Sequence, residues 1–300
     1  MLSRSRTPPP ASVAHRSIRF VLPSSLQISI VTFLPDLPLF TRTLDTLAIA
    51  IAAAQEANVL RTVHLALIDN SGDRGVAERV IELGGARFAE TPVHVMYLHG
   101  HANIGFGAAH NLVLHGTGAD YHLVLNPDAE LAADALVNAI RWLDAHPEVG
   151  ALAPAVTDAD GCRAYLCKRY PAVFDLMLRG FAPRFVQRLF ARRLARYEMR
   201  DIVDAEPPQD AIGVPLMSGA CMIVRREAID RTGGFDPRFF LYFEDYDWTM
   251  RLRELTQTAY VPSVRVVHHG GGAARKGFQH MRWFVASGAR FYSKHGWKWI

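Results

Sequence analysis

The sequence QISIVTF, residues 27–33, decides the fold. It is a continuous apolar run of the kind found in strands that are buried on both faces of a sheet. Residues 37–57 follow, with apolar side chains at helical spacing, and a second apolar run comes at 63–68. Strand, helix and strand in this order, joined by short loops, predict a βαβ unit with parallel strands.

The same alternation continues to about residue 154. Further strands are expected at 93–98, 121–125 and 149–154, and further helices at 74–83, 107–114 and 131–145. The predicted fold class is therefore α/β, with a mostly parallel central sheet flanked by helices. Open sheets of this kind bind ligands at the carboxyl ends of their strands. We therefore expect the site in the loops that follow Phe33, Ile68, Leu98 and Leu125.

The alternation of strands and helices ends after Pro154. Residues 170–201 form an arginine-rich stretch with a helical pattern, and residues 216–224 read as another strand. We interpret the second half as an elaboration of the same sheet, with a boundary near residue 155 as the alternative. The predicted organisation is a flexible leader at 1–25, a main domain at 26–275 with halves at 26–155 and 156–275, and a helical tail at 276–300.

Composition excludes several classes of protein. Of the 300 residues, 50% are hydrophobic and 21% charged, which excludes a disordered or collagen-like chain. Apolar runs such as 47–54 fall short of the roughly 18 residues that a membrane span requires. Cys162, Cys167 and Cys221 are odd in number and lack the spacing of a zinc site, so we expect a reducing, cytoplasmic location. A net charge of +4 is too small and too local to predict nucleic-acid binding.

The loops of the first half hold two candidate features. Residues 105–110 partly match a dinucleotide-binding fingerprint, but His110 replaces its third glycine. We therefore expect the two glycines only to let the loop lead closely into the following helix. Asp128 follows a strand directly, where a carboxylate can bind a divalent cation that also holds phosphates. The alternative is that Asn126-Pro127-Asp128 is only a turn before a helix.

The second half places acids and histidines at the ends of elements. Glu244, Asp245 and Asp247 begin a helical pattern after a run of aromatic residues. They could simply complement the helix dipole, whereas aromatic neighbours would desolvate a carboxylate and raise its pKa, as a general base requires. His268 and His269 follow a predicted strand and are either metal ligands or ordinary packed histidines.

Taken in order, these loops resemble the family 2 glycosyltransferases of the GT-A fold, in particular the bacterial rhamnosyltransferase-like branch that builds cell-surface polysaccharide. The resemblance covers about residues 27–275. It rests on an ordered set of motifs: Ile30-Val31-Thr32, Ile68-Asp69-Asn70-Ser71, Asn103-Ile104-Gly105-Phe106-Gly107 with Asn111, Leu125-Asn126-Pro127-Asp128, Ser218-Gly219-Ala220, Gly233-Gly234-Phe235-Asp236, Phe243-Glu244-Asp245-Tyr246-Asp247, and Val267-His268.

The resemblance implies a GT-A fold with a Rossmann-like sheet, and a role for each matching residue. It implies a nucleotide-sugar pocket at Thr32, Asp69, Asn103, Gly105, Phe106, Asn126 and Asp128. It implies a divalent cation, Mg²⁺ or Mn²⁺, at Asp128 and His268, with His269 the weaker match. It implies a catalytic base at Asp245, with Glu244 and Asp247 as supporting acids.

Two positions depart from the family pattern. Asn126 stands where the metal-binding D-x-D motif has its first aspartate, which removes one charge at the metal. Leu34 stands where many relatives have asparagine, at the edge of the nucleotide pocket. Metal dependence and the identity of the base are therefore left open.

The resemblance implies an enzyme that moves a sugar, with rhamnose as a candidate, from a nucleotide diphosphate sugar to a hydroxyl of a glycan or lipid-linked acceptor. Asp245 would take the hydroxyl proton, and attack opposite the leaving diphosphate would invert the anomeric carbon. The rival hypotheses are a nucleotidyltransferase, which residues 32–38 disfavour because they hold no glycine, lysine or arginine, and a catalytically silent sugar-nucleotide or glycan-binding module.

The acceptor side is basic and apolar. Arginines recur between apolar residues from Arg179 to Arg200, a pattern that suits an anionic membrane surface and equally suits a solvated face packed on the sheet. Aromatic residues and lysines at 283–299 suggest the same contact. The expected partners are a sugar-nucleotide donor, an acceptor and a peripheral contact with the inner membrane face.

Overall fold

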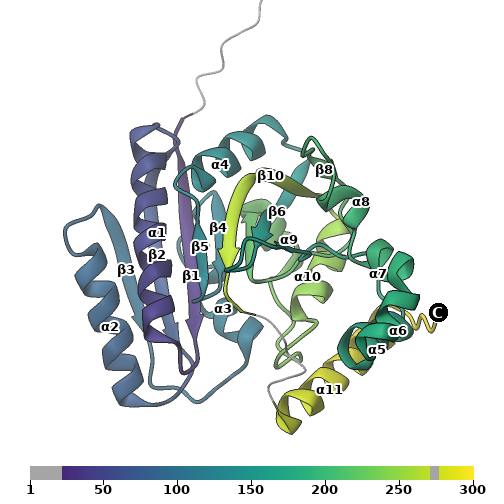
Figure 1. Ribbon diagram of the computed structural model, residues 1–300. Helices are drawn as coiled ribbons and strands as arrows, with labels where there is room; N and C mark the ends of the chain where they lie inside the picture. Colours follow the sequence, from purple (N-terminus) through teal and green to yellow (C-terminus); the bar gives the residue numbers. More distant parts are fainter. Residues whose placement is uncertain (1–21, 271–276) are drawn as a thin grey trace, which may run out of the picture.

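The computed structural model describes residues 22–270 and 277–300, and its central sheet contains the predicted parallel strands (Figure 1). Four of them lie side by side in the order β3-β2-β1-β4 and run parallel. Their bounds are Ser24–Thr32 for β1, Leu60–Asp69 for β2, Val93–Leu98 for β3 and Tyr121–Leu125 for β4. The carboxyl ends of these strands therefore meet along one edge of the sheet, as the alternation predicts.

The second half of the chain extends the same sheet. Its strands are β6 (Val149–Thr157), β9 (Cys221–Arg225) and β10 (Gln257–His268), with short strands β5 (Ala129–Leu131), β7 (Arg163–Ala164) and β8 (Ala211–Ile212). Strand β9 runs antiparallel to both β4 and β6, so it joins the two halves. The parallel prediction holds for the first half, and β9 makes the complete sheet mixed.

Helices cover both faces of the sheet. One layer consists of α1 (Leu37–Glu56), α2 (Arg74–Phe88) and α4 (Ala135–Ala145). The other holds α3 (Phe106–Leu114), α9 (Arg226–Thr232) and α10 (Glu244–Arg253). Alternate side chains of β1 enter the two cores, Ile30 on the side of α1 and Val31 on the side of α3, which explains the continuous apolar run.

Helix α1 is the one helix of the described residues that is long and apolar enough, on average over its length, to cross a membrane. Its longest unbroken run of apolar residues is 47–54. One face of the helix, which includes Phe40, Leu44 and Leu47, is buried against the sheet. It is therefore a core helix of the domain.

Several predicted boundaries differ from the structure. The helix expected from Leu131 is preceded by β5, because residues 129–131 pair with β10. In place of a continuous pattern over residues 170–201, the structure has three short helices, α5 (Val173–Phe181), α6 (Arg184–Leu189) and α7 (Ala191–Tyr197), and the start of a fourth, α8 (Arg200–Val203). Pro183 separates the first two, because proline cannot continue a helix. Of the leader predicted at 1–25, residues 1–21 lie outside the described residues, whereas Ser24 and Ser25 already belong to β1 because they continue its pairing with β2.

The C-terminal segment packs beside these short helices (Figure 1). Helix α11 (Phe278–His295) contributes Phe291 and Tyr292 to an aromatic cluster with Phe239 and Phe243. The chain then returns to α5, where Val173 N–H donates to the carbonyl of Lys298 at 2.8 Å. α5, α6 and α11 thus form one wall near the start of α10.

Candidate active site

The ends of β1 and β2 bring two predicted nucleotide-binding residues together. Thr32 and Asp69 are register partners and both are buried. The Thr32 hydroxyl lies 3.4 Å from Asp69 Oδ1, and Asp69 Oδ2 accepts a 2.8 Å hydrogen bond from the Ser71 hydroxyl. The adjacent parallel strands thus present a carboxylate and a hydroxyl at the sheet edge where open α/β folds bind ligands.

Asn70 organises the next loop, and it was not among the predicted site residues. Its Nδ2 donates to Asn103 Oδ1 at 2.9 Å, and its Oδ1 accepts from the Ile104 N–H at 3.1 Å. Asn103 Oδ1 in turn accepts from the Gly105 N–H at 2.9 Å. The side chain is 2% exposed, so these bonds fix the shape of the loop. Its place between Asp69 and Ser71 in the motif was the available signal.

Gly105 and Phe106 connect this loop to the second half of the chain. Gly105 has φ of +92°, and a Cβ there would overlap the carbonyl oxygen of Phe240. The Phe106 N–H donates to that oxygen at 3.0 Å, and the Phe106 ring lies against Gly219. Only glycine allows this approach of two backbones.

The loop after β4 places Asn126 and Asp128 next to His268. Asp128 Oδ1 and Asn126 Nδ2 each lie 3.2 Å from His268 Nε2. His269 points to Glu130, with Nε2 and Oε1 separated by 2.6 Å, and so does not join them. The turn at Asn126 leads into β5, not into a helix, which sets aside the helix-start interpretation of Asp128.

These residues fit a divalent cation that a diphosphate helps to hold. A carboxylate and an imidazole are ligands that Mn²⁺ and Mg²⁺ sites use. At Gly270 a Cβ would lie 2.6 Å from Asp128 Oδ2 and 2.9 Å from His268 Nε2, so glycine keeps this space open. The described residues contain no cluster of three or more acids, histidines or cysteines suited to a metal ion. Phosphate oxygens would therefore have to complete the coordination.

The segment Ser218–Ala220 joins the Asp128 loop to Asp245. The Asn126 N–H donates to the Ala220 carbonyl at 2.9 Å, and the Gly219 N–H donates to Asp245 Oδ2 at 2.9 Å. This segment leads directly into β9. Two predicted groups from opposite halves of the chain are thus held by neighbouring backbone atoms.

Asp245 and Glu244 begin α10 in a desolvated environment. Burial raises the pKa of Asp245, although hydrogen bonds from the Gly219 and Tyr246 N–H groups oppose that rise. Burial and the charge of Asp245 raise the pKa of Glu244 well above its usual value. Glu244 Oε2 has no hydrogen-bond partner among the described residues. The pair therefore holds a proton preferentially on Glu244 and leaves Asp245 as the available carboxylate.

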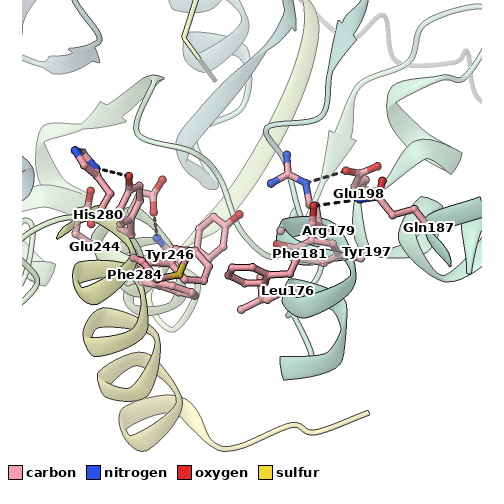
Figure 2. Close-up of a pocket in the computed structure, with 15 residues that line it drawn as sticks. Leu176, Arg179, Phe181, Gln187, Tyr197, Glu198, Glu244, Tyr246, His280 and Phe284 are labelled. Carbon is pink, nitrogen blue, oxygen red and sulfur yellow. Dashed lines mark hydrogen bonds and ion pairs between the residues drawn. The ribbon is translucent and has the colours of Figure 1, made fainter. Parts of the chain in front are cut away.

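A cavity of about 770 Å³ opens beside this pair (Figure 2). One wall carries Glu244 and His280 of α11, and the opposite wall carries Arg179 and Glu198 (Figure 2). Asp245 also lines the cavity. Further lining residues are Leu176, Gly180, Phe181, Gln187, Tyr197, Tyr242, Phe243, Tyr246, Met281 and Phe284. The cavity is large enough for a sugar and part of its attached chain.

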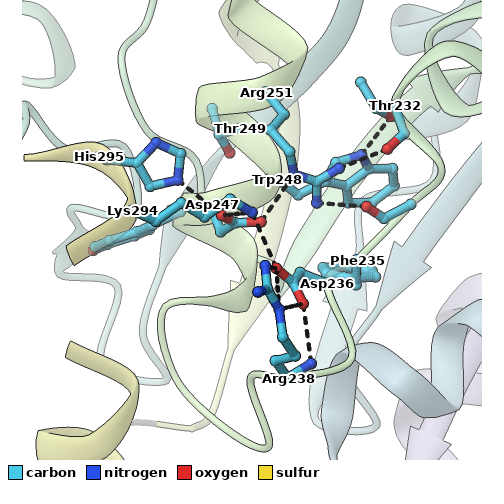
Figure 3. A network of polar contacts seen from close by, with 12 residues as sticks. Thr232, Phe235, Asp236, Arg238, Asp247, Trp248, Thr249, Arg251, Lys294 and His295 are labelled. Atoms are coloured by element: carbon cyan, nitrogen blue, oxygen red, sulfur yellow. Dashed lines mark hydrogen bonds and ion pairs between the residues drawn. The ribbon is translucent and has the colours of Figure 1, made fainter. Parts of the chain in front are cut away.

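Asp247 lies away from this cavity. Residues 245 and 247 are about 200° apart around a helix, so their side chains leave opposite faces of α10. Asp247 is buried and contacts Arg251, Lys294 and His295 at 2.9, 2.6 and 2.8 Å (Figure 3). These ion pairs connect α10 to α11 and hold the pKa of Asp247 below its usual value against the effect of burial. Asp247 therefore supports the fold around the site and does not face the cavity.

Comparison with known proteins now decides the family. The family model described as "Glycosyltransferase like family 2" matches residues 30–286. The chain belongs to this family. It is a glycosyltransferase, as the ordered motifs predict, and its relatives support the same assignment.

Two curated relatives and one solved structure illustrate the similarity. N-acetylglucosaminyl-diphospho-decaprenol L-rhamnosyltransferase of Mycobacterium tuberculosis is 30% identical over 227 residues, which covers 70% of this chain and 67% of the relative. Rhamnosyltransferase WbbL of Escherichia coli strain K12 is 25% identical over 182 residues, 58% of this chain and 62% of its own length. The crystal structure of GalNAc-T7 with UDP, GalNAc and Mn²⁺ has a TM-score of 0.61 at 14% identity. That match covers 90% of this chain and 48% of the solved one. The predicted GT-A fold is confirmed.

The close approach at Gly105 of this family 2 glycosyltransferase gives one prediction. We expect Gly105→Ala to lower the free energy of unfolding by about 3 kcal/mol. The new Cβ would overlap the carbonyl oxygen of Phe240, and a φ of +92° is strained for alanine. Gly100→Ala is the matched control, since Gly100 has φ of +85° with open space around it. It should cost about 1 kcal/mol. Urea denaturation measures both, and equal losses would contradict the account.

The Asp247 network of the glycosyltransferase gives a second prediction. Asp247→Asn should lower the free energy of unfolding by about 3 kcal/mol at neutral pH. It removes the buried carboxylate that is the ion-pair partner of Arg251 and His295 and one of the two partners of Lys294. The folded pKa is lowered, so this contribution is present above the unfolded value near 3.8 and is lost as the pH falls through the folded pKa.

Denaturation series at several pH values test this prediction. The difference between wild type and variant should be constant near neutral pH and shrink below about pH 4. Glu78→Gln, which removes an exposed pair with Arg74, is the control and should cost less than about 0.5 kcal/mol. A loss of the same size for both variants would show that the network is not stabilising.

Proposed function

We propose that this glycosyltransferase moves a sugar, rhamnose being the leading candidate, from a nucleotide diphosphate sugar to a hydroxyl of a lipid-linked or glycan acceptor in cell-surface polysaccharide synthesis, with inversion. One observation carries the proposal. The Asp245 carboxylate lines the large cavity and is tied through Gly219 and Ala220 to the Asp128 loop. The names of two relatives, both rhamnosyltransferases, support the sugar, and the mycobacterial name supports a lipid diphosphate acceptor.

Asp245 acts as the general base in this proposal. Its carboxylate accepts the proton of the acceptor hydroxyl while that oxygen forms a bond to the anomeric carbon. The bond from the same carbon to the diphosphate oxygen breaks on the opposite face, and the nucleoside diphosphate leaves with the electron pair. Burial raises the pKa of Asp245, which strengthens it as a base. Glu244, which holds its own proton, limits the negative charge beside it.

The donor is proposed to lie along the edge formed by β1, β2 and β4. Thr32 and Asp69 would contact the base and ribose, and the loop from Asn103 to Phe106 would close the pocket, held in shape by Asn70. Asn126 would contribute an amide beside the diphosphate.

Asp128 and His268 are the residues that would hold Mg²⁺ or Mn²⁺. When bound, such a cation neutralises negative charge on the leaving diphosphate. Asn126 adds an uncharged amide where the family pattern has a carboxylate, so the protein supplies one negative charge, from Asp128, to this site.

Replacement of the base is the direct test of this function. Asp245→Asn keeps the shape of the side chain and removes its basicity, so we expect turnover to fall about a thousandfold while donor affinity is retained. The measurement is release of nucleoside diphosphate from a panel of sugar nucleotides that includes dTDP-rhamnose, with acceptor and with either metal. Asp160→Asn, an exposed residue, is the control. As the pH of the wild-type assay is lowered, kcat/KM should begin to fall at a pH above the usual pKa of aspartate, because the pKa of Asp245 is raised. Undiminished turnover in the Asp245 variant would contradict the proposal.

We place the enzyme at the cytoplasmic face of a membrane, which it contacts through α5, α6 and the C-terminal segment. These elements expose large apolar side chains, namely Met177, Phe181, Phe185, Leu189, Phe278, Val285, Trp299 and Ile300. Exposed Arg184, Arg188 and Arg192 accompany them. Apolar side chains with arginines between them suit a bilayer that contains anionic lipids.

Vesicle binding tests this contact. Phe185 and Leu189 are 73% and 80% exposed, so Phe185→Ser with Leu189→Ser should leave the fold intact. We expect the double variant to bind vesicles of phosphatidylglycerol and phosphatidylcholine about tenfold more weakly, because two side chains leave the interface. Ile49→Ser, on α1 and 56% exposed, is the control and should bind as the wild type does. Equal co-sedimentation of all three proteins would contradict the proposed surface.

A further inference from the structure

Arg179 lines the same cavity as Asp245, on the wall opposite Glu244 (Figure 2). It is in the last turn of α5, and about half of its side chain is exposed. Its Nε donates to Glu198 Oε1 at 3.0 Å. Within the described part of the chain, neither terminal nitrogen of the guanidinium has a hydrogen-bond partner. One edge of the guanidinium is therefore anchored while its terminal nitrogens remain available.

The charge around Arg179 is not balanced. The nearly buried carboxylate of Glu198 also accepts two hydrogen bonds from Arg200, at 3.0 and 2.6 Å, and lies 3.7 Å from Lys168 Nζ. Burial lowers the pKa of Lys168 to about 7, so this lysine is partly charged near neutral pH. Even without it, Arg179 shares this carboxylate with Arg200, which also interacts with Asp204. An anion at the free edge of Arg179 would add the negative charge that this sharing leaves incomplete.

The rest of the cavity is suited to an apolar chain attached to that anion. Leu176 and Phe181 come from α5, and Met281 and Phe284 come from α11. Phe181 both lines the cavity and, at 54% exposed, belongs to the proposed membrane contact, so the apolar lining adjoins that surface. The cavity thus combines a carboxylate, a guanidinium and an apolar path in one space.

We infer that Arg179 binds a phosphate of an amphiphilic acceptor and thereby directs the acceptor's sugar hydroxyl toward Asp245. A guanidinium presents paired N–H groups that match phosphate oxygens. The donor also carries a diphosphate, but its proposed binding residues, Asp128 and His268, do not line this cavity. The inference rests on the proposed function, because it assigns the acceptor to the same cavity.

Calorimetry with farnesyl diphosphate tests the inference without sugar transfer. This probe has an apolar chain and a diphosphate but no sugar, so its binding does not depend on turnover. We expect the wild type to bind it and Arg179→Gln to bind it at least about tenfold more weakly. Arg179→Lys should lie between them, because lysine keeps the charge and loses the paired geometry. Arg253→Gln, at the far end of α10, removes the same charge from an exposed position and should match the wild type.

A second titration separates the two sources of phosphate. With dTDP and Mn²⁺, all four proteins should have dissociation constants within about twofold of one another. The inference is overturned if the wild type does not bind farnesyl diphosphate, if Arg179→Gln binds it as the wild type does, or if Arg179→Gln weakens dTDP equally. Thermal unfolding checks that each variant is folded. If Arg179→Gln is unfolded, the weaker binding expected of Arg179→Lys still tests the inference. Failure of the proposed function would instead appear as undiminished turnover by Asp245→Asn.

Discussion

The backbone of Gly219 and Ala220 is the constraint on which the rest of the site depends. The Gly219 N–H holds Asp245, and the Ala220 carbonyl holds the Asn126 N–H at the start of the Asp128 loop. The segment can do both because β9 runs antiparallel beside β4, which brings its beginning to the carboxyl end of that strand. The loop proposed to face the donor and the carboxylate proposed as the base come from distant parts of the sequence and are thereby fixed in one place.

Keeping Asp245 there is costly, and the surrounding structure compensates. Tyr242 and Phe243 have φ of +70° and +64°, each a strain of about 1–3 kcal/mol for residues other than glycine. The Phe243 ring is packed among aromatic side chains of α11. Asp247, on the opposite face of α10, adds ion pairs to the same helix. Packing and ion pairs between α10 and α11 thus maintain a strained turn that presents a desolvated carboxylate to the cavity.

The sequence was sufficient to predict the parallel half of the fold and the site residues at the ends of its strands. The spacing of apolar residues and the position of a residue at the end of a strand are local properties of the sequence. Thr32, Asp69 and Asp128 lie at the predicted sheet edge for this reason. The start of the helix after Leu131 was predicted wrongly because local sequence patterns do not report pairing between distant segments. Strand β5 forms only because it pairs with β10. The direction of Asp247 and the presence of Arg179 in the cavity that Asp245 lines depend on contacts between distant helices, which one sequence does not reveal.

The central claim is a single displacement in which the acceptor attacks from the cavity side, opposite the leaving diphosphate. Proton NMR of the first product formed, recorded before any anomeric equilibration, tests it most directly, since it compares the configuration of the transferred sugar with that in the donor. The account predicts inversion at the anomeric carbon. Retention of configuration would contradict it, because a single base at Asp245 and one displacement cannot produce that outcome.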